Sequence, residues 1–425
     1  MLIEFSVANF RSIREMQTIS MKARNLKSKD PRTDKRNTFK AEGSGEDMLK
    51  VIGIFGGNAS GKSNLLMALY AMIYCTLRSM LKQDILSKIL MPFSLDKDSI
   101  SKPTFFEIKF IQNGNRFRYG FEATKEYIYS EWLFMTKENS KETYLFKKEG
   151  ERILINSKSF PSGHKLKSSV LAIFPKHNAL LLTFFGLMGD DPIIKPIIKY
   201  LNNLIRFDFG KTPFSVSTHE IEESILNKEA KSRILKILQT ADMNIADLGS
   251  QEYASPEGDV ELNLVVVKNK RDSNGKISGT TTFNFVLEAE GTKRLFTLGI
   301  LVDKVLRSGG ILLVDEFDAR LHPNLSRLIV ELFQLPETNP KNAQLIFVSH
   351  DTQFMSLDLL RRDQICFVRQ NAQRATEIYS LAEFKGVRND KGVEAEYLRG
   401  LYGGVSSLNM FLEAFNQTDH AIEAD

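Results

Sequence analysis

The chain has 425 residues, of which 42% are hydrophobic and 26% charged, so it is long enough to bury a large core in two or three lobes. Its 57 basic and 52 acidic side chains give a formal net charge of +5, which permits contact with nucleic acid without arguing for it. The two cysteines, Cys75 and Cys366, are far apart and lack metal-ligand spacing. This excludes a disulfide framework and a zinc site and favours a reducing, cytoplasmic setting.

The first 21 residues predict a half-buried strand, because Leu2, Phe5, Val7 and Phe10 alternate with polar neighbours. A basic run between Lys22 and Arg36 follows. We interpret this run as a solvated loop, and a patch that contacts DNA is the alternative.

Residues 56–63 read Gly-Gly-Asn-Ala-Ser-Gly-Lys-Ser, the G-x-x-x-x-G-K-S pattern of a phosphate-binding loop. The apolar run before it predicts a buried strand, and the helix formers after it predict a helix. This context disfavours a glycine-rich turn followed by Lys-Ser by chance. We therefore predict that the chain binds ATP, with Lys62 at the β- and γ-phosphates and the Ser63 hydroxyl on Mg²⁺. The residues predicted to line this part of the site are Gly56, Asn58, Gly61, Lys62 and Ser63.

Residues 65–81 are the most apolar long stretch, but they contain Tyr70, Tyr74 and Arg78 and follow the phosphate loop directly. A buried helix explains them better than a membrane span, so we expect no membrane partner.

A strand-rich zone begins near Pro103, with alternating runs at 105–110, 116–121 and 127–134 and a hairpin turn at Asn113-Gly114. This pattern predicts an antiparallel meander. The pattern from about 165 to 247 is helical, with Leu201, Leu204 and Ile205 on one face and a second group at 221–238. It predicts a compact helical insertion without a long coiled coil.

Strands return at 260–267 and 281–287, and a helix is expected to start near Thr292. Residues 311–314 and 344–348 are continuous apolar runs typical of buried parallel strands, with a helix from Pro323 between them. The predicted fold class is α/β: a P-loop NTPase with a mixed or mainly parallel core sheet flanked by helices, an antiparallel β subdomain and a helical insertion. The expected parts are residues 1–160, 161–250 and 251–425.

Two carboxylates, Asp315 and Glu316, follow the first of these parallel runs. Asp315 is predicted to hold Mg²⁺ beside Ser63, and Glu316 to act as general base on the attacking water. The alternative is a strand that merely ends in an acidic turn, which the phosphate loop disfavours. His350 ends the next parallel run and is predicted to contact the γ-phosphate, with a structural histidine as the alternative.

The order of Lys62-Ser63, Asp315-Glu316 and His350 resembles ATPase heads of the ABC type, as in the SMC, Rad50 and RecF proteins. Asn9-Phe10-Arg11-Ser12-Ile13 is similar to the opening of those heads. More narrowly, segments 288–295, 315–323, 363–368 and 379–403 resemble the RloA/AbiL group of prokaryotic antiphage ATPases. The likeness spans nearly the whole chain and is weakest in the helical insertion.

The resemblance implies a head-to-tail homodimer or higher oligomer in which a signature segment of one subunit caps ATP held by another. By order along the chain that segment is Ala289-Glu290-Gly291-Thr292, with Gly291 and Thr292 facing the nucleotide. The family usually has a serine where this chain has Ala289, which removes one hydroxyl contact. Asp318 falls at the position of the D-loop aspartate and is expected to line the same interface. No glutamine stands out as a Q-loop residue.

The resemblance further implies a separate effector, often a Toprim-type nuclease, whose activity ATP occupancy controls. A DNA-repair head that binds DNA directly, as RecF does, is the second hypothesis and draws on the basic run. A transporter ATPase is a third. The absence of a Leu-Ser-Gly-Gly-Gln signature and the long separation of Lys62 from Asp315 argue against it.

Overall fold

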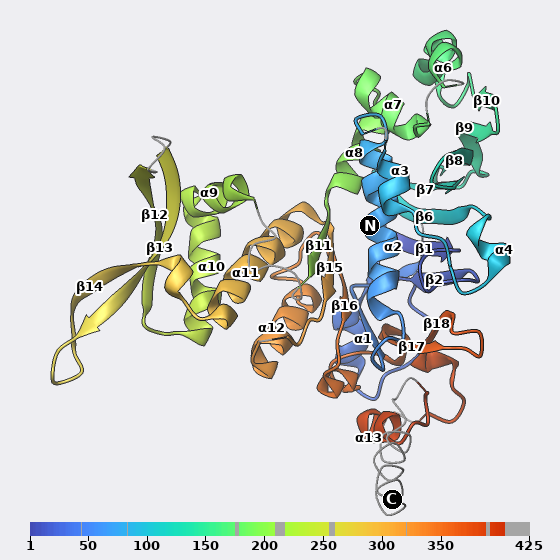
Figure 1. The fold of residues 1–425 in the computed structure, drawn as a ribbon. Helices are drawn as coiled ribbons and strands as arrows, with labels where there is room; N and C mark the ends of the chain where they lie inside the picture. Colours follow the sequence, from blue (N-terminus) through green and yellow to red (C-terminus); the bar gives the residue numbers. More distant parts are fainter. Residues whose placement is uncertain are drawn as a thin grey trace, which may run out of the picture.

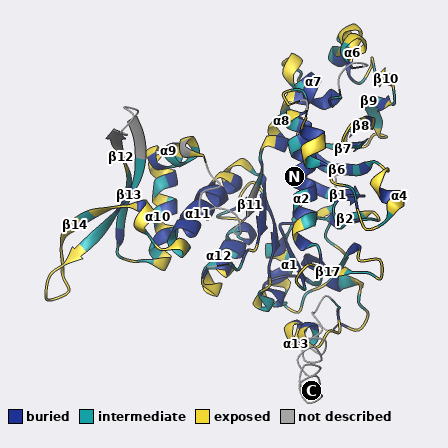
Figure 2. Ribbon diagram, in the orientation of Figure 1, coloured by how far each residue is buried: buried dark blue, intermediate teal, exposed yellow. Residues whose placement is uncertain are grey.

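The computed structural model describes residues 1–43, 45–82, 84–174, 178–208, 217–254, 260–319, 321–387 and 392–403. Two sheets lie on either side of helix α2 (Lys62–Arg78), and a smaller three-stranded sheet extends away from them (Figure 1). The buried residues concentrate in the two larger sheets and the helices against them (Figure 2).

The core sheet has six strands. In spatial order they are β11 (Leu204–Asp208), β15 (Ile311–Asp315), β16 (Gln344–Val348), β5 (Val51–Gly56), β17 (Ile365–Gln370) and β18 (Thr376–Ser380). All neighbours are parallel except β17 and β18. Every residue of β5, β15 and β16 is buried, because helices cover both faces of the sheet. The predicted buried parallel strands are thus confirmed.

Alternate residues of the core strands face two separate hydrophobic clusters. Leu313 and Ile346 pack in the first cluster with α2. Leu312 and Leu345 pack in the second with helices α11 (Glu290–Ser308) and α12 (Pro323–Gln334). Since successive side chains of a strand point to opposite faces, a run without polar residues can supply both clusters.

The second large sheet is antiparallel and packs in the first cluster with α2. Its strands, in spatial order, are β10 (Arg152–Ile155), β9 (Thr143–Glu149), β8 (Ile128–Thr136), β7 (Asn115–Ala123), β6 (Thr104–Gln112), β1 (Leu2–Ala8) and β2 (Gln17–Ser20). Asn113 and Gly114 join β6 to β7 with φ of 50° and 71°, as a two-residue primed turn requires. The predicted meander and first strand are confirmed, and they belong to one sheet.

The region predicted as a helical insertion is not helical throughout. It contains α5 (Pro161–Lys165), α6 (Lys167–Ile173), α7 (Leu181–Met188), α8 (Ile194–Asn202), α9 (Thr218–Leu226) and α10 (Lys228–Ala241). Leu201 ends α8, whereas Leu204 and Ile205 begin β11, so the prediction that they share a helical face is wrong. Pairing with β15 overrides the local pattern, because it gives the backbone of β11 a parallel ladder at the edge of the core sheet.

The third sheet, which we call the arm, consists of β12 (Ile245–Ala254), β13 (Val260–Arg271) and β14 (Ile277–Asn284). It lies against α9 and α10 and points away from the core sheet (Figure 1). The arm contains the two strands predicted near 260 and 281. A short 3₁₀ turn, η1 (Phe285–Leu287), joins the arm to α11, which begins two residues before the predicted start at Thr292.

The basic run between Lys22 and Arg36 is not simply a solvated loop. It contains helix α1 (Pro31–Asn37), and its charged groups pair with the C-terminal part of the chain. Arg24 Nη2 lies 2.9 Å from Glu383 Oε1, and Arg361 Nη1 lies 2.5 Å from Asp34 Oδ1. The remaining short elements are β3 (Thr38–Lys40), β4 (Asp47–Leu49), α3 (Ile85–Ile89), α4 (Lys97–Ile100), η2 (Thr352–Met355), η3 (Arg362–Gln364), η4 (Leu381–Glu383) and α13 (Val393–Leu398). Among the residues that the structure describes, no helix is both long and apolar enough to cross a membrane.

Candidate nucleotide-binding site

The phosphate loop connects β5 to α2 at the carboxyl end of the core sheet. Gly61 precedes the helix with φ of 102°, a conformation that L-residues rarely adopt. A Cβ atom there would lie 1.9 Å from Thr376 Oγ1, so space also requires glycine. A cavity of about 340 Å³ opens at this loop. The predicted site residues that line it are Asn58, Gly61, Lys62, Ser63, Asp315, Glu316 and His350.

Lys62 is 6% exposed, and its ammonium group is held inside the loop. Its Nζ donates to the carbonyl oxygens of Gly56 at 2.8 Å and Gly57 at 2.9 Å. Burial lowers the pKa of Lys62 to about 8, against the opposing effect of nearby Asp315, Asp318 and Glu316. Burial of the ammonium group is unfavourable without a negative partner. A phosphate ligand at this position would supply that negative charge.

Ser63 and Asp315 meet although 252 positions separate them in the chain. Ser63 Oγ donates to Asp315 Oδ1 at 3.0 Å, and Asp315 is 4% exposed at the end of β15. A hydroxyl and a carboxylate are hard oxygen ligands of the kind that Mg²⁺ takes together with water and substrate phosphates. Within the described residues, His, Cys, Asp and Glu side chains form no group of three that could hold a metal. The pair therefore fits an ion that a nucleotide and water help to bind.

Glu316 and His350 also line the cavity. Glu316 has a left-handed backbone with φ of 52° and an exposed side chain, so it turns outward where β15 ends. Such strain is found at functional sites more often than elsewhere. Partial burial, together with the positive charge of Lys62, lowers the pKa of His350. The imidazole is therefore neutral near pH 7, with one nitrogen able to accept and the other to donate a hydrogen bond.

Asp318 does not line the cavity. Its Oδ1 accepts hydrogen bonds from Ser349 Oγ at 2.7 Å and from the backbone N–H of His350 at 3.0 Å. This carboxylate thus fixes the loop after β16 relative to the loop after β15. The expectation that Asp318 faces a subunit interface remains a prediction, and the single chain gives it a second role in positioning His350.

The signature segment is also separate from the cavity, since neither Gly291 nor Thr292 lines it. The segment forms the first turn of α11, which packs in the second hydrophobic cluster. Ala289 is the N-cap residue and offers no side-chain hydrogen bond, so backbone N–H groups of this first turn lack the usual cap. Within one chain, these groups do not contribute to the phosphate-loop cavity.

Residues 51–356 match the family model described as "AAA domain, putative AbiEii toxin, Type IV TA system", which spans the phosphate loop, both carboxylates and His350. The chain belongs to this family. The match and the core sheet confirm the predicted α/β P-loop fold class and place the chain among ATPases of the AAA-domain type.

Solved structures give distant matches. An SMC head bound to the C-terminal winged-helix domain of ScpA is 13% identical with a TM-score of 0.44, covering 89% of this chain and 97% of that one. RecF from the RecFOR pathway, solved with an ATP analogue, is 12% identical with a TM-score of 0.34, covering 89% and 98%. A dimeric ATP-binding cassette bound to ADP and phosphate is 12% identical with a TM-score of 0.31, covering 89% and 100%. No curated protein matches the sequence.

Four residues of this AAA-family site were not identified from the sequence as parts of it. Thr376 Oγ1 donates to the Ser60 carbonyl oxygen at 3.0 Å and lies 2.7 Å from Ser12 Oγ. Asn64 Nδ2 donates to Ser12 Oγ at 2.7 Å, and Gln370 Nε2 donates to the Ala59 carbonyl oxygen at 2.9 Å. Ser12 in the β1–β2 turn, Gln370 in β17 and Thr376 in β18 thus hold the phosphate loop and the first turn of α2, to which Asn64 belongs. Ser12 lies in the motif Asn9-Phe10-Arg11-Ser12-Ile13, whereas no sequence pattern marks Thr376 or Gln370.

Asn9 explains why the motif around Ser12 has its sequence. Its backbone is left-handed, with φ of 52°, and its side-chain amide donates to the carbonyl oxygens of Ser99 at 2.9 Å and Lys102 at 2.8 Å. The amide oxygen accepts from the Phe93 N–H at 3.0 Å. Asparagine tolerates this conformation, and its side chain satisfies buried backbone groups. The motif thus positions Ser12 beside the phosphate loop.

Proposed function

We propose that this chain hydrolyses ATP to ADP and phosphate, with Lys62, Ser63, Asp315, Glu316 and His350 as its working groups. The carrying observation is the 3.0 Å contact between Ser63 and Asp315 in the cavity that Lys62, Glu316 and His350 also line. Five groups from three separate stretches of sequence meet there, and each is of the type that phosphoryl transfer uses.

The phosphates bind first. They replace the Gly56 and Gly57 carbonyl oxygens as partners of Lys62, while loop N–H groups and the start of α2 face the negative charge. Ser63 and Asp315 would hold Mg²⁺, which when bound offsets charge on the β- and γ-phosphate oxygens. Asn58 also lines the cavity that would hold the phosphates.

Glu316 then accepts a proton from water as the water oxygen attacks the γ-phosphorus. The bond between that phosphorus and the β,γ-bridging oxygen breaks, and the electron pair leaves with ADP. His350, neutral near pH 7, donates a hydrogen bond to the γ-phosphate and is held by the Asp318 contact to its backbone. Loss of the γ-phosphate removes that bond, so the loop after β16 senses which nucleotide is bound.

A second copy of the chain completes the site in this proposal. Its Gly291 and Thr292 N–H groups, at the first turn of α11, face the γ-phosphate held by the first copy. Two features support this: the N-cap Ala289 leaves those donors without a side-chain partner, and Val286 and Leu287 beside them are 62% and 77% exposed. Asp318 would then border the same interface.

We further propose that ATP-dependent pairing controls a separate effector, a Toprim-type nuclease, in an antiphage role like that of RloA/AbiL ATPases. The family description, with its AbiEii toxin and type IV toxin–antitoxin system, supports a defence setting. Direct DNA binding in the manner of RecF is less favoured, because several basic side chains of the run already pair with carboxylates: Arg24 with Glu383, Arg32 with Asp30 and Lys22 with Glu46.

The test is ATP turnover by the full chain carrying Glu316→Gln. Loss of a general base lowers turnover by roughly 100- to 10,000-fold, while ATP affinity stays within about threefold of wild type. Glu138→Gln, an exposed change in the turn after β8, is the matched control and should leave both unchanged. A Glu316→Gln protein that turns over ATP at the wild-type rate would remove Glu316 as the base.

A further inference from the structure

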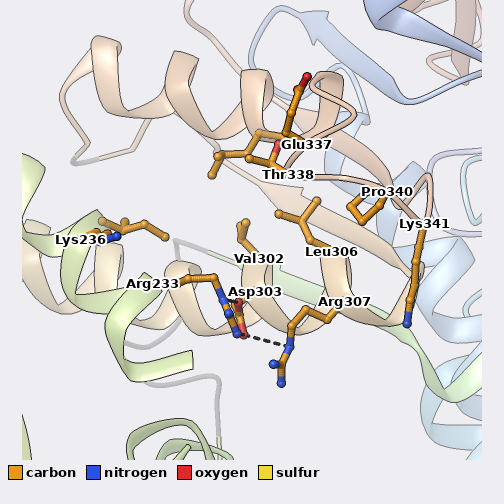
Figure 3. A pocket seen from close by; sticks show the side chains of 12 residues that line it. Arg233, Lys236, Val302, Asp303, Leu306, Arg307, Glu337, Thr338, Pro340 and Lys341 are labelled. Atoms are coloured by element: carbon orange, nitrogen blue, oxygen red, sulfur yellow. Dashed lines mark hydrogen bonds and ion pairs between the residues drawn. The ribbon is translucent and has the colours of Figure 1, made fainter. Parts of the chain in front are cut away.

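A second and larger cavity, of about 540 Å³, lies away from the nucleotide site (Figure 3). It opens between α10, α11 and the loop that follows α12. Its volume is within the range of sites that bind small molecules or a few side chains of a peptide. None of the residues that line it also lines the phosphate-loop cavity.

The floor of this cavity is apolar. Ile237 comes from α10, Val302 and Leu306 from α11, and Leu332 from α12. Figure 3 shows Val302 and Leu306 pointing into the space between the helices. A floor of this kind favours apolar side chains, because each one buried there leaves water.

The rim is basic. Arg233, Lys236, Arg307 and Lys341 surround the opening, against the carboxylates of Asp303 and Glu337. Asp303 is 8% exposed and already engaged: Arg233 Nε lies 2.5 Å and Arg307 Nε 3.4 Å from its oxygens. Lys236 and Lys341 are exposed on opposite sides of the floor. The rim therefore attracts an anionic ligand whose apolar part fits the floor.

The chain itself contains a segment with this chemistry. Residues 404–425 lie outside the described residues and contain no lysine or arginine. Their apolar residues recur at spacings of three, four and seven positions, at Leu408, Phe411, Leu412 and Phe415. Their acidic residues are Glu413, Asp419, Glu423 and Asp425. Fully extended, the eight residues after Gly403 would carry Phe411 up to about 29 Å from it.

We propose that residues 404–425 dock in the cavity between α10 and α11, with apolar side chains on the floor and carboxylates at the basic rim. The complementarity is twofold, in polarity and in sign of charge. The C-terminal half of α11 lines this cavity, and the signature segment forms the first turn of the same helix. Docking therefore places residues 404–425 against the helix that carries the signature segment.

Disulfide trapping in the full-length chain tests this. The test variant combines Lys236→Cys with Phe411→Cys. The control variant combines Phe411→Cys with Lys276→Cys, which lies at the exposed tip of the arm. The native thiols do not interfere, because burial raises the pKa of Cys75 and Cys366 to about 12. Under oxidised glutathione, the first pair should form its disulfide at least about tenfold faster than the second, because docking raises the effective concentration.

Adding Lys341→Glu to the first pair should slow disulfide formation several-fold, and a higher salt concentration should do the same. Lys304→Glu, on the outer face of α11, is the control and should not change the rate. The mass of the oxidised product separates docking within one chain from docking between two copies, and either supports the proposal. Equal trapping rates for the Lys236 and Lys276 pairs would overturn it.

Discussion

The two ends of the proposed ATP site differ in how completely one chain builds them. At the phosphate loop, the motif residues are tied together: Lys62 to the loop carbonyls, Ser63 to Asp315, and Thr376 to Ser60. At the signature segment, Ala289 caps α11 without a side-chain hydrogen bond, and its neighbours Val286 and Leu287 are exposed. One end is preassembled, and the other is a helix start without a side-chain cap beside apolar surface.

This difference indicates that the phosphate loop binds ATP and that the signature segment serves in pairing. Preassembly lets a single chain recognise phosphate with little change beyond the exchange of the carbonyl partners of Lys62 for phosphate oxygens, and we expect this to favour ATP binding. An uncapped helix terminus next to exposed apolar side chains gains most from a ligand or a second copy. Changes at the first end should therefore abolish binding, whereas changes at the second should alter pairing and local stability.

The largest effect is expected for Lys62→Ala, which breaks the preassembled end. The ammonium makes charge-assisted hydrogen bonds to phosphate, so its loss should weaken ATP binding by roughly 100-fold or more. Fluorescent ATP titration of the full chain measures this, with exposed Lys97→Ala in α4 as the matched control. Retained affinity in Lys62→Ala would mean that the cavity is not the phosphate site.

A smaller effect should follow from pH. Lys62 has a pKa of about 8 without nucleotide, and bound phosphates raise it. Above pH 8 the free chain has lost the proton that the complex needs, so binding takes up a proton and weakens as pH rises. ATP affinity should fall about tenfold between pH 7 and pH 9. Calorimetry in two buffers of different ionisation enthalpy at pH 9 measures the uptake, and a flat profile would contradict the shift.

The smallest effect is expected at the signature segment, where α11 begins without a side-chain cap. Ala289→Ser supplies the missing N-cap, because a serine hydroxyl accepts a hydrogen bond from the second or third N–H of α11. The free energy of unfolding should rise by about 0.5–1 kcal/mol in urea denaturation. Ala172→Ser, in the last turn of α6 and so away from any N-cap position, is the control and should lower stability slightly. No gain at Ala289 would show that the first turn is satisfied in another way.

The sequence was informative where local pattern and tertiary structure agree. The phosphate loop, the runs at 311–314 and 344–348, and the meander could be predicted because buried parallel strands and hairpins have short-range signatures. Lys62, Ser63, Asp315, Glu316 and His350 could be brought together because the carboxyl ends of parallel strands share one edge of the sheet.

What could not be predicted depends on long-range contacts. Leu204–Asp208 reads as a continuation of α8, and only its pairing with β15 makes it a strand. Thr376 and Gln370 support the phosphate loop from more than 300 positions away, through one hydrogen bond each to its backbone. A single polar residue at the end of a strand has no pattern that marks such a role. The ion pairs of the basic run could not be predicted from the sequence for the same reason.

The most direct test of the divided site is the mass of the full chain in solution, with and without Mg-ATP, for wild type and Glu316→Gln. The variant binds ATP without turning it over, so the account predicts that its mass doubles only when Mg-ATP is present, while wild type pairs transiently. A mass that never responds to ATP, in a protein shown to bind it, would contradict completion of the site by a second copy.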